Sequence, residues 1–110
     1  MAASALLTAA TVATHANSAV QTLTLTAPVS GVHLTLDNSA TTGAVASVIL
    51  LAAVSIDGTN FSSMQRIGEA QPGEKRDVYH DAKNAAKVQY AVYNRDATTA
   101  ATVSLLAIQV

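Results

Sequence analysis

Hydrophobic and polar residues alternate along much of the chain from residue 20 onward, and this pattern predicts β-strands. Residues 22–27 place threonine at every second position between leucine and alanine, and residues 32–37 alternate valine and leucine with polar side chains. A period of two puts every second side chain on one face of a strand, so each run predicts a strand with one buried face. Pro28 and Gly31 separate the two runs.

The stretch from residue 44 to 56 is hydrophobic on both alternating faces and is the predicted central strand. A strand that is apolar on both sides is expected to be covered on both sides. It leads into residues 57–60, Asp-Gly-Thr-Asn, which predict a tight hairpin turn because Asp-Gly tolerates positive φ angles. Residues 61–70 are then the expected partner strand. Residues 71–74, with proline second and glycine third, predict a type II turn.

Two further strands are predicted towards the end of the sequence. Residues 87–94 direct Val88, Tyr90 and Val92 inward, whereas residues 101–110 are hydrophobic on both faces. A terminal strand of that kind is unusual for an isolated monomer. Short strands with turn signals between them predict an all-β fold, an antiparallel β-sandwich for which the jelly roll is one arrangement.

Residues 1–19 do not share this pattern and consist mainly of alanine, serine and threonine. Alanine favours helix, but β-branched threonine opposes it, and no charges or caps mark a helix. We therefore predict an extended N-terminal arm or an edge strand that orders against another surface, with a short helix as the alternative. The sandwich domain is assigned to residues 20–110. The start lacks the basic residues of a signal peptide, so a removed leader is not expected.

Composition changes this picture by indicating a need for partners. Half of the residues are hydrophobic, but only 4% are aromatic and alanine is abundant, so the core gains little area per residue. Association would add the missing burial. Only 12% of residues are charged, mostly between residues 66 and 87, which are the best candidate for a solvated edge or loop. No basic stripe is present, so a nucleic-acid partner is not expected.

Cysteine is absent, which excludes disulfides and cysteine-based metal sites and mildly favours assembly inside a cell. The apolar run 44–56 is shorter than the ~20 residues that span a bilayer, so a membrane partner is not expected either. We expect a homo-oligomer whose interface uses apolar residues of the arm and of the last strand. These residues are Leu6, Leu7, Val12, Leu106, Ile108 and Val110.

Residues with catalytic or ligand-binding chemistry form no recognised motif. His15, His33 and His80 lack the spacing of a metal site, and no serine lies in a Gly-x-Ser-x-Gly elbow. We therefore assign no catalytic, cofactor or metal residue and expect no enzyme activity. Tyr79 and Tyr93 are the candidates for stacking on a sugar, although partial burial in the core or an interface is the favoured interpretation of both.

Two segments resemble small all-β virion proteins of tailed bacteriophages. They are residues 54–61, Val-Ser-Ile-Asp-Gly-Thr-Asn-Phe, and residues 88–96, Val-Gln-Tyr-Ala-Val-Tyr-Asn-Arg-Asp, with 101–104, Ala-Thr-Val-Ser, after them. The alanine- and threonine-rich composition is similar to that of head decoration (cement) proteins and minor capsid components. A strand ending in Asp-Gly-Thr-Asn also occurs in discoidin-like jelly rolls that bind sugars or lipids.

The resemblance implies a protein of the virion, assembled in the host cytoplasm, that docks on a major capsid protein and stabilises the shell. A trimer is the expected homo-oligomer for such a decoration protein, and no catalytic residue transfers from that class. One alternative is a carbohydrate-binding module of a tail or adhesin, with recognition in the loops at 57–60 and 95–99. Another is a tail-tube or head–tail adaptor component.

Overall fold

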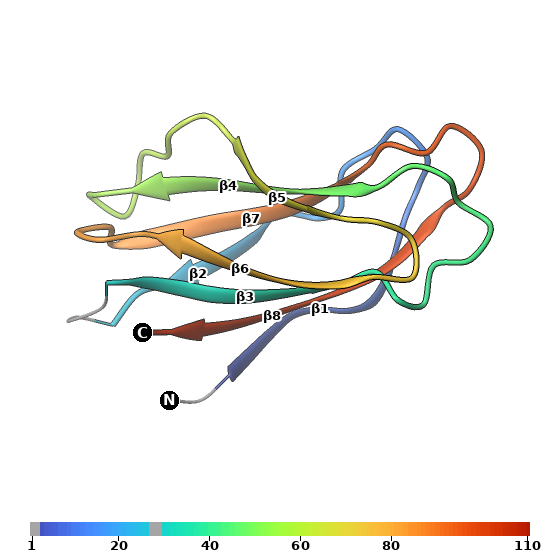
Figure 1. Ribbon diagram of the computed structural model, residues 1–110. Coiled ribbons are helices and arrows are strands. Elements are labelled where there is room, and N and C mark those ends of the chain that lie inside the picture. Colours follow the sequence, from blue (N-terminus) through green and yellow to red (C-terminus); the bar gives the residue numbers. More distant parts are fainter. Residues whose placement is uncertain (1–2, 27–29) are drawn as a thin grey trace.

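The computed structural model describes residues 3–26 and 30–110, which form eight β-strands and no helix (Figure 1). Ala27, the last residue of the first alternating run, and the predicted break at Pro28 lie outside the described residues. The strands are β1 (Ala3–Val12), β2 (Gln21–Thr24), β3 (Gly31–Asp37), β4 (Val48–Ser55), β5 (Gln65–Ala70), β6 (Lys75–Asp81), β7 (Lys87–Asn94) and β8 (Ala101–Gln109).

The strands form two four-stranded antiparallel sheets packed face to face. Sheet A has the order β1-β8-β3-β6 and sheet B the order β2-β7-β4-β5. The first strand pairs with the eighth, the second with the seventh, the third with the sixth and the fourth with the fifth. The chain is therefore a long hairpin folded at the β4–β5 loop and rolled up, which is the arrangement of a jelly roll. The predicted all-β antiparallel sandwich is confirmed.

Alternating side chains of both sheets fill the core between them. Leu34 and Leu36 of β3 and Leu105 of β8 face Leu50 and Val92 from sheet B, and all five are at most 1% exposed. Complete burial of a leucine stabilises a fold by roughly 1.5–3 kcal/mol, so these layers dominate the packing energy. The inward positions predicted for β3 and β7 are confirmed.

Strand β1 lies within the range predicted as an arm and forms the edge of sheet A through its pairing with β8. The register shifts between Ala5 and Leu7 and again between Leu7 and Ala10, so the strand carries two bulges. Ala9 has a φ of 45° and donates its N–H to Ser104 Oγ at 2.9 Å. A bulge bends a strand and interrupts its outer ladder, so β1 is an irregular edge.

The β4–β5 connection differs from the predicted hairpin. Residues 61–64 are not a strand, and β5 begins only at Gln65. The carboxylate of Asp57 accepts the N–H groups of Thr59 and Asn60, both at 2.8 Å, and this local cap makes a wide loop instead of a two-residue turn. The predicted turn at 71–74 is confirmed, because Gly73 has a φ of 84° and the chain closes there within four residues.

Strand β4 is fully covered on its inward face and covered in part on its outer face. Its inward residues pack against sheet A, whereas Ile49 and Leu51 on the outer face are partly exposed. Ala53, on the same outer face, is only 2% exposed. The expectation that this strand is covered on both sides therefore holds at Ala53 and only in part at Ile49 and Leu51.

Candidate interaction face on sheet A

The outer face of sheet A presents four rows of side chains. The inward residues of β3 and β8 are buried, so the intervening residues point outward, and the strand register places them side by side. From β6 towards β1, the rows are Lys75, Asp37 and Ser104; Asp77, Thr35, Leu106 and Ala5; Tyr79, His33, Ile108 and Ala3; and Asp81, Gly31 and Val110.

This face divides lengthwise into two halves of different chemistry. The apolar half, on β8 and β1, consists of Ala3, Ala5, Leu106, Ile108 and Val110. Leu106 and Val110 are 39% and 40% exposed, which is high for large hydrophobic residues. The polar half, on β3 and β6, consists of His33, Thr35, Asp37, Lys75, Asp77, Tyr79 and Asp81. A contiguous exposed apolar strip with a polar border is typical of a protein contact surface.

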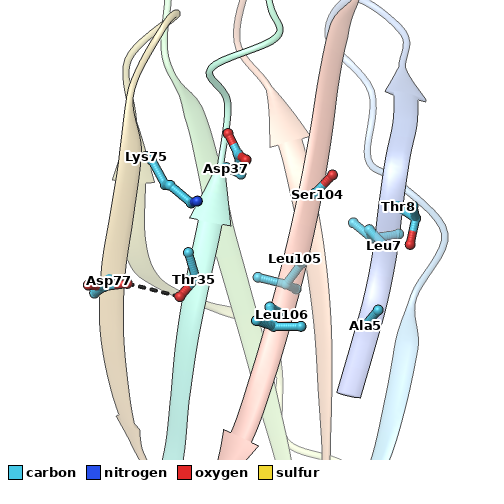
Figure 2. Close-up of a pocket in the computed structure, with 10 residues that line it drawn as sticks. All are labelled: Ala5, Leu7, Thr8, Thr35, Asp37, Lys75, Asp77, Ser104, Leu105 and Leu106. Atoms are coloured by element: carbon cyan, nitrogen blue, oxygen red, sulfur yellow. Dashed lines mark hydrogen bonds between the residues drawn. The ribbon is translucent and has the colours of Figure 1, made fainter. Parts of the chain in front are cut away.

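A groove of about 610 Å³ runs along the boundary of the two halves (Figure 2). Thr35 Oγ1 donates to Asp77 Oδ1 at 2.9 Å across its polar side. The hydroxyl and N–H of Ser39 hydrogen-bond to Asp37, and together with the nearby Lys75 ammonium they lower the pKa of that carboxyl. The Asp37 carboxylate is therefore ionised at neutral pH, and Lys75 provides the opposite charge.

Tyr79 is held over the sheet by its neighbours. Its ring lies 5.1 Å from the ring of His33, measured between centroids, and it extends over Gly31. A β-carbon at Gly31 would lie 2.5 Å from the Tyr79 hydroxyl oxygen, so only glycine leaves room for the ring. Tyr79 remains 48% exposed. It is thus a fixed, half-exposed aromatic group beside the groove.

The residues predicted for the interface separate into two groups. Leu106, Ile108 and Val110 all point outward from β8 and belong to the apolar half. Leu7 and Val12 are instead buried in the core of this chain, at 8% and 1% exposure, and offer little surface to a partner. Leu6 is partly buried against the same core. The bulge between Ala5 and Leu7 brings Leu7 opposite the inward-facing Leu105.

The two tyrosines predicted as ligand contacts do not come together. Tyr79 lies on the outer face of sheet A, whereas Tyr93 lies on β7 in sheet B, paired with Ile49 and bridged to Asn17. The structure also reveals surface residues that the sequence did not single out, namely His33, Thr35, Asp37 and Lys75. Only the pairing of β3 with β6 brings them together, and periodicity alone does not specify that pairing.

The remaining titratable groups have structural roles. His80 points inward from β6, and its Nδ1 lies 2.7 Å from the hydroxyl of Tyr90 on the opposite sheet. Burial lowers the pKa of His80 and raises that of Tyr90. Asp77 and Asp81 point to the other face of β6, so His80 does not share a site with them. Within residues 3–26 and 30–110, no three potential ligands group around a possible metal position.

Asp96 connects two loops at the end of the sandwich where the β3–β4 and β7–β8 loops lie. Its side chain is buried and accepts the backbone N–H groups of Thr98, Val45, Ala46 and Thr99. These hydrogen bonds hold the pKa of Asp96 well below its usual range. The carboxylate ties the β3–β4 loop to the β7–β8 loop, and its donors leave it no free acceptor position aimed at a ligand.

Comparisons with known protein families, with curated proteins and with solved structures find no match to this chain. In the described part of the chain, no helix has the length and hydrophobicity needed to cross a bilayer.

Proposed function

We propose that this protein is a non-enzymatic structural component of a virion that decorates or cements a phage capsid. Its partners are other copies of itself and a major capsid protein. The observation that supports this proposal most is the apolar half of sheet A, where Leu106 and Val110 are exposed next to the alanine-rich edge strand β1. Such a surface gains free energy when another protein covers it.

The distribution of charge supports the same proposal. No charged residue precedes Asp37 and none follows Asp96 in the sequence. Strands β1, β2 and β8 therefore carry no charge, and sheet A displays an uncharged strip along one side. Surfaces that must stay in water usually carry abundant mixed charge. An uncharged strip fits a repeated protein contact, in which many small interfaces on a shell add up through avidity.

The fold alone does not distinguish the proposed function from others, because jelly rolls serve as capsid domains, lectins and cupins. The proposal rests on the surface and is tested on particles. The chain should co-purify with assembled particles at a fixed copy number relative to the shell protein. Leu106→Lys should reduce its occupancy about tenfold or more, because a buried ammonium would lose its hydration.

A matched control is available on the opposite sheet. Leu51 is also a partly exposed leucine on an outer sheet face, so Leu51→Lys introduces the same charge without touching sheet A. This variant should keep wild-type occupancy. Equal loss in both variants would point to a general effect of charge, and absence of the chain from particles would refute the proposed function.

Saccharide binding in the groove is a second candidate, favoured by one observation. Tyr79 is half-exposed next to Asp77 and Thr35, an arrangement that offers an aromatic surface for the apolar face of a sugar and acceptors for its hydroxyls. Glycan-array binding that is lost in Tyr79→Ala and kept in Tyr93→Ala would support it. An array without any bound glycan would exclude it for the glycans tested.

A further inference from the structure

We infer that the outer face of sheet A is a self-contact in which two copies of the chain pack face to face around a two-fold axis. The axis lies in the interface, runs across the strands and passes between the rows of Leu106 and Ile108. This inference deepens the proposed function, on which it rests, by naming a second copy of the chain as the occupant of the apolar half. It gives a dimer, where the resemblance to decoration proteins favours a trimer.

The register determines which residues this axis brings together. Rotation about an axis across the strands keeps each strand opposite its own counterpart and reverses the order of the rows. The first row therefore faces the fourth, and the second faces the third. A two-fold contact of this kind is isologous, so every residue pair occurs twice. Two sheets can stack in this way about 10 Å apart with their strands nearly aligned.

The apolar halves match in this arrangement. Leu106 faces Ile108 of the second copy, and Ala5 faces Ala3 of the second copy. Large side chains on β8 thus meet near the axis, while the small side chains of β1 allow close approach at the border. The exposed apolar area of Leu106 and Ile108 is removed from water in both copies.

One pair of opposite charges in the polar halves also matches. Lys75 stands at one end of β6 and Asp81 at the other, so the axis places Lys75 opposite Asp81 of the second copy. The pair occurs twice by symmetry. In the described chain, the Lys75 ammonium is near the Asp37 carboxylate but forms no salt bridge, so it can also contact Asp81 of the second copy. The Tyr79 hydroxyl, which lies over Gly31, comes opposite the Asp37 carboxylate of the second copy.

Other two-fold arrangements match less well. An axis parallel to the strands and through the middle of the sheet would place β6 over β1 and bury charged side chains against alanine. Pairing of two β1 edges would extend sheet A, but the bulges around Leu7 leave only short regular stretches with free ladder groups. The face-to-face arrangement matches the hydrophobic positions with one another and brings Lys75 opposite Asp81.

The area of the outer face of sheet A determines the affinity expected for the dimer. Four strands about 4.8 Å apart and seven residues at about 3.4 Å each give a flat area of roughly 450 Å² per copy. The total of roughly 900 Å² lies at the low end of specific interfaces. We therefore expect a concentration-dependent dimer in the micromolar range, strengthened when both copies are bound to the same particle.

A charge exchange between Lys75 and Asp81 tests the contact. Sedimentation equilibrium of the full chain should show monomer and dimer. Lys75→Asp alone and Asp81→Lys alone should each weaken dimerisation about tenfold, because each places like charges opposite one another. The double variant Lys75→Asp/Asp81→Lys should recover most of the affinity. The two residues lie at opposite ends of β6, so rescue can arise only between copies.

Leu106→Lys should abolish the dimer, and Leu51→Lys should leave it intact. A chain that stays monomeric up to about 1 mM, a trimer, or a double charge variant that shows no recovery would each overturn the inference. These outcomes are separate from particle binding. A monomer that still occupies particles would refute the dimer and leave the proposed function standing. A dimer that never binds particles would support the self-contact and refute the proposed function.

Discussion

The two long sides of the sandwich protect their edges by different means. On one side, β5 and β6 are joined by the tight turn at Gln71–Glu74 and carry exposed ion pairs, such as Arg66 with Glu69 and Arg76 with Glu74. On the other side, β1 and β2 contain no charged residue, and β1 relies on bulges while β2 is only four residues long. Charge, bulges and shortness all discourage edge pairing.

The comparison shows that protection from edge pairing and suitability for water are separate properties. Bulges in β1 interrupt its free ladder without making the neighbouring surface polar. The charge-free side thus resists indiscriminate strand addition but keeps an apolar strip on β8 that a shaped protein partner can cover. On the charged side, the exposed charged side chains of β5 and β6 are hydrated directly.

The largest expected effect is a difference in the free energy of unfolding between variants on the two faces of β8. Leu105→Ala removes a side chain that is 1% exposed and should lower the free energy of unfolding by about 2–5 kcal/mol. The adjacent Leu106→Ala removes an outward side chain and should change it by less than about 0.5 kcal/mol at a concentration where the chain is monomeric. Urea denaturation of both variants measures the difference. Equal losses would mean that the outward face of β8 is covered within the monomer.

The next largest effect on stability is expected where β5 packs against β6 on the charged side. A β-carbon at Gly68 of β5 would lie 2.6 Å from Val78 Cγ2 of β6, so Gly68→Ala should destabilise the fold by about 1–3 kcal/mol through overpacking. Val78→Ala removes that contact. The double variant should therefore be less destabilised than the sum of the two single variants. Strict additivity in urea denaturation would show that β5 and β6 do not pack as described.

The charged side should also be the acid-sensitive one. Burial lowers the pKa of His80 on β6, so the unfolded chain, with a histidine pKa near 6.5, binds more protons than the folded one. Stability should be constant between about pH 6.5 and pH 10, the unfolded pKa values of His80 and Tyr90, and should fall as the pH drops below 6.5. A second loss should begin below pH 3.8, where the carboxyl of Asp96 becomes protonated in the unfolded chain.

Urea denaturation across this pH range measures both steps. His80→Gln should remove the first step and keep the second. Asp96→Asn should keep the first step and reduce the second, to which Asp37, Asp57 and Glu69 also contribute because hydrogen bonds lower the pKa of their carboxyls as well. A first step that persists in His80→Gln would assign it to another group.

The smallest effect is expected for a charge placed on β1. Thr8 is an exposed residue at the border of the groove, so Thr8→Lys should change the free energy of unfolding by less than about 0.5 kcal/mol. The same variant should weaken dimerisation only slightly, because Thr8 lies at the border of the face, on the edge strand and outside the rows of Leu106 and Ile108. A stability loss above about 1 kcal/mol would show that this part of β1 is not freely exposed.

Periodicity was sufficient to predict the fold class and most inward positions. The alternations in β3, β7 and β8 specify which residues are buried, and Pro72 with Gly73 specifies a turn. It did not predict the loop after β4, because the Asp57 cap is a set of local hydrogen bonds instead of a repeating pattern. It also missed the inward position of Leu7, which depends on the bulge between Ala5 and Leu7.

The sequence was sufficient to predict the apolar residues of the candidate interaction face on β8 but not its polar half. Leu106, Ile108 and Val110 belong to one strand, and their common face follows from a period of two. The polar half combines β3 and β6, which are far apart in the sequence, and the register that places Asp77 beside Thr35 arises only in the folded sheet. Partner identity depends on surface pairing of this kind, which a single strand pattern does not encode.

The pairing of β1 with β8 also affects the timing of synthesis. During translation, β1 emerges first and has no strand to pair with until Ala101–Gln109 has been made. Until then, Leu7 and Val12 lack the strand that holds them in the core. Folds dominated by such distant pairings form slowly, in milliseconds to seconds. A ribosome-bound or truncated chain without β8 therefore cannot present the complete outer face of sheet A, so the proposed contacts of that face can form only after β8 has been made.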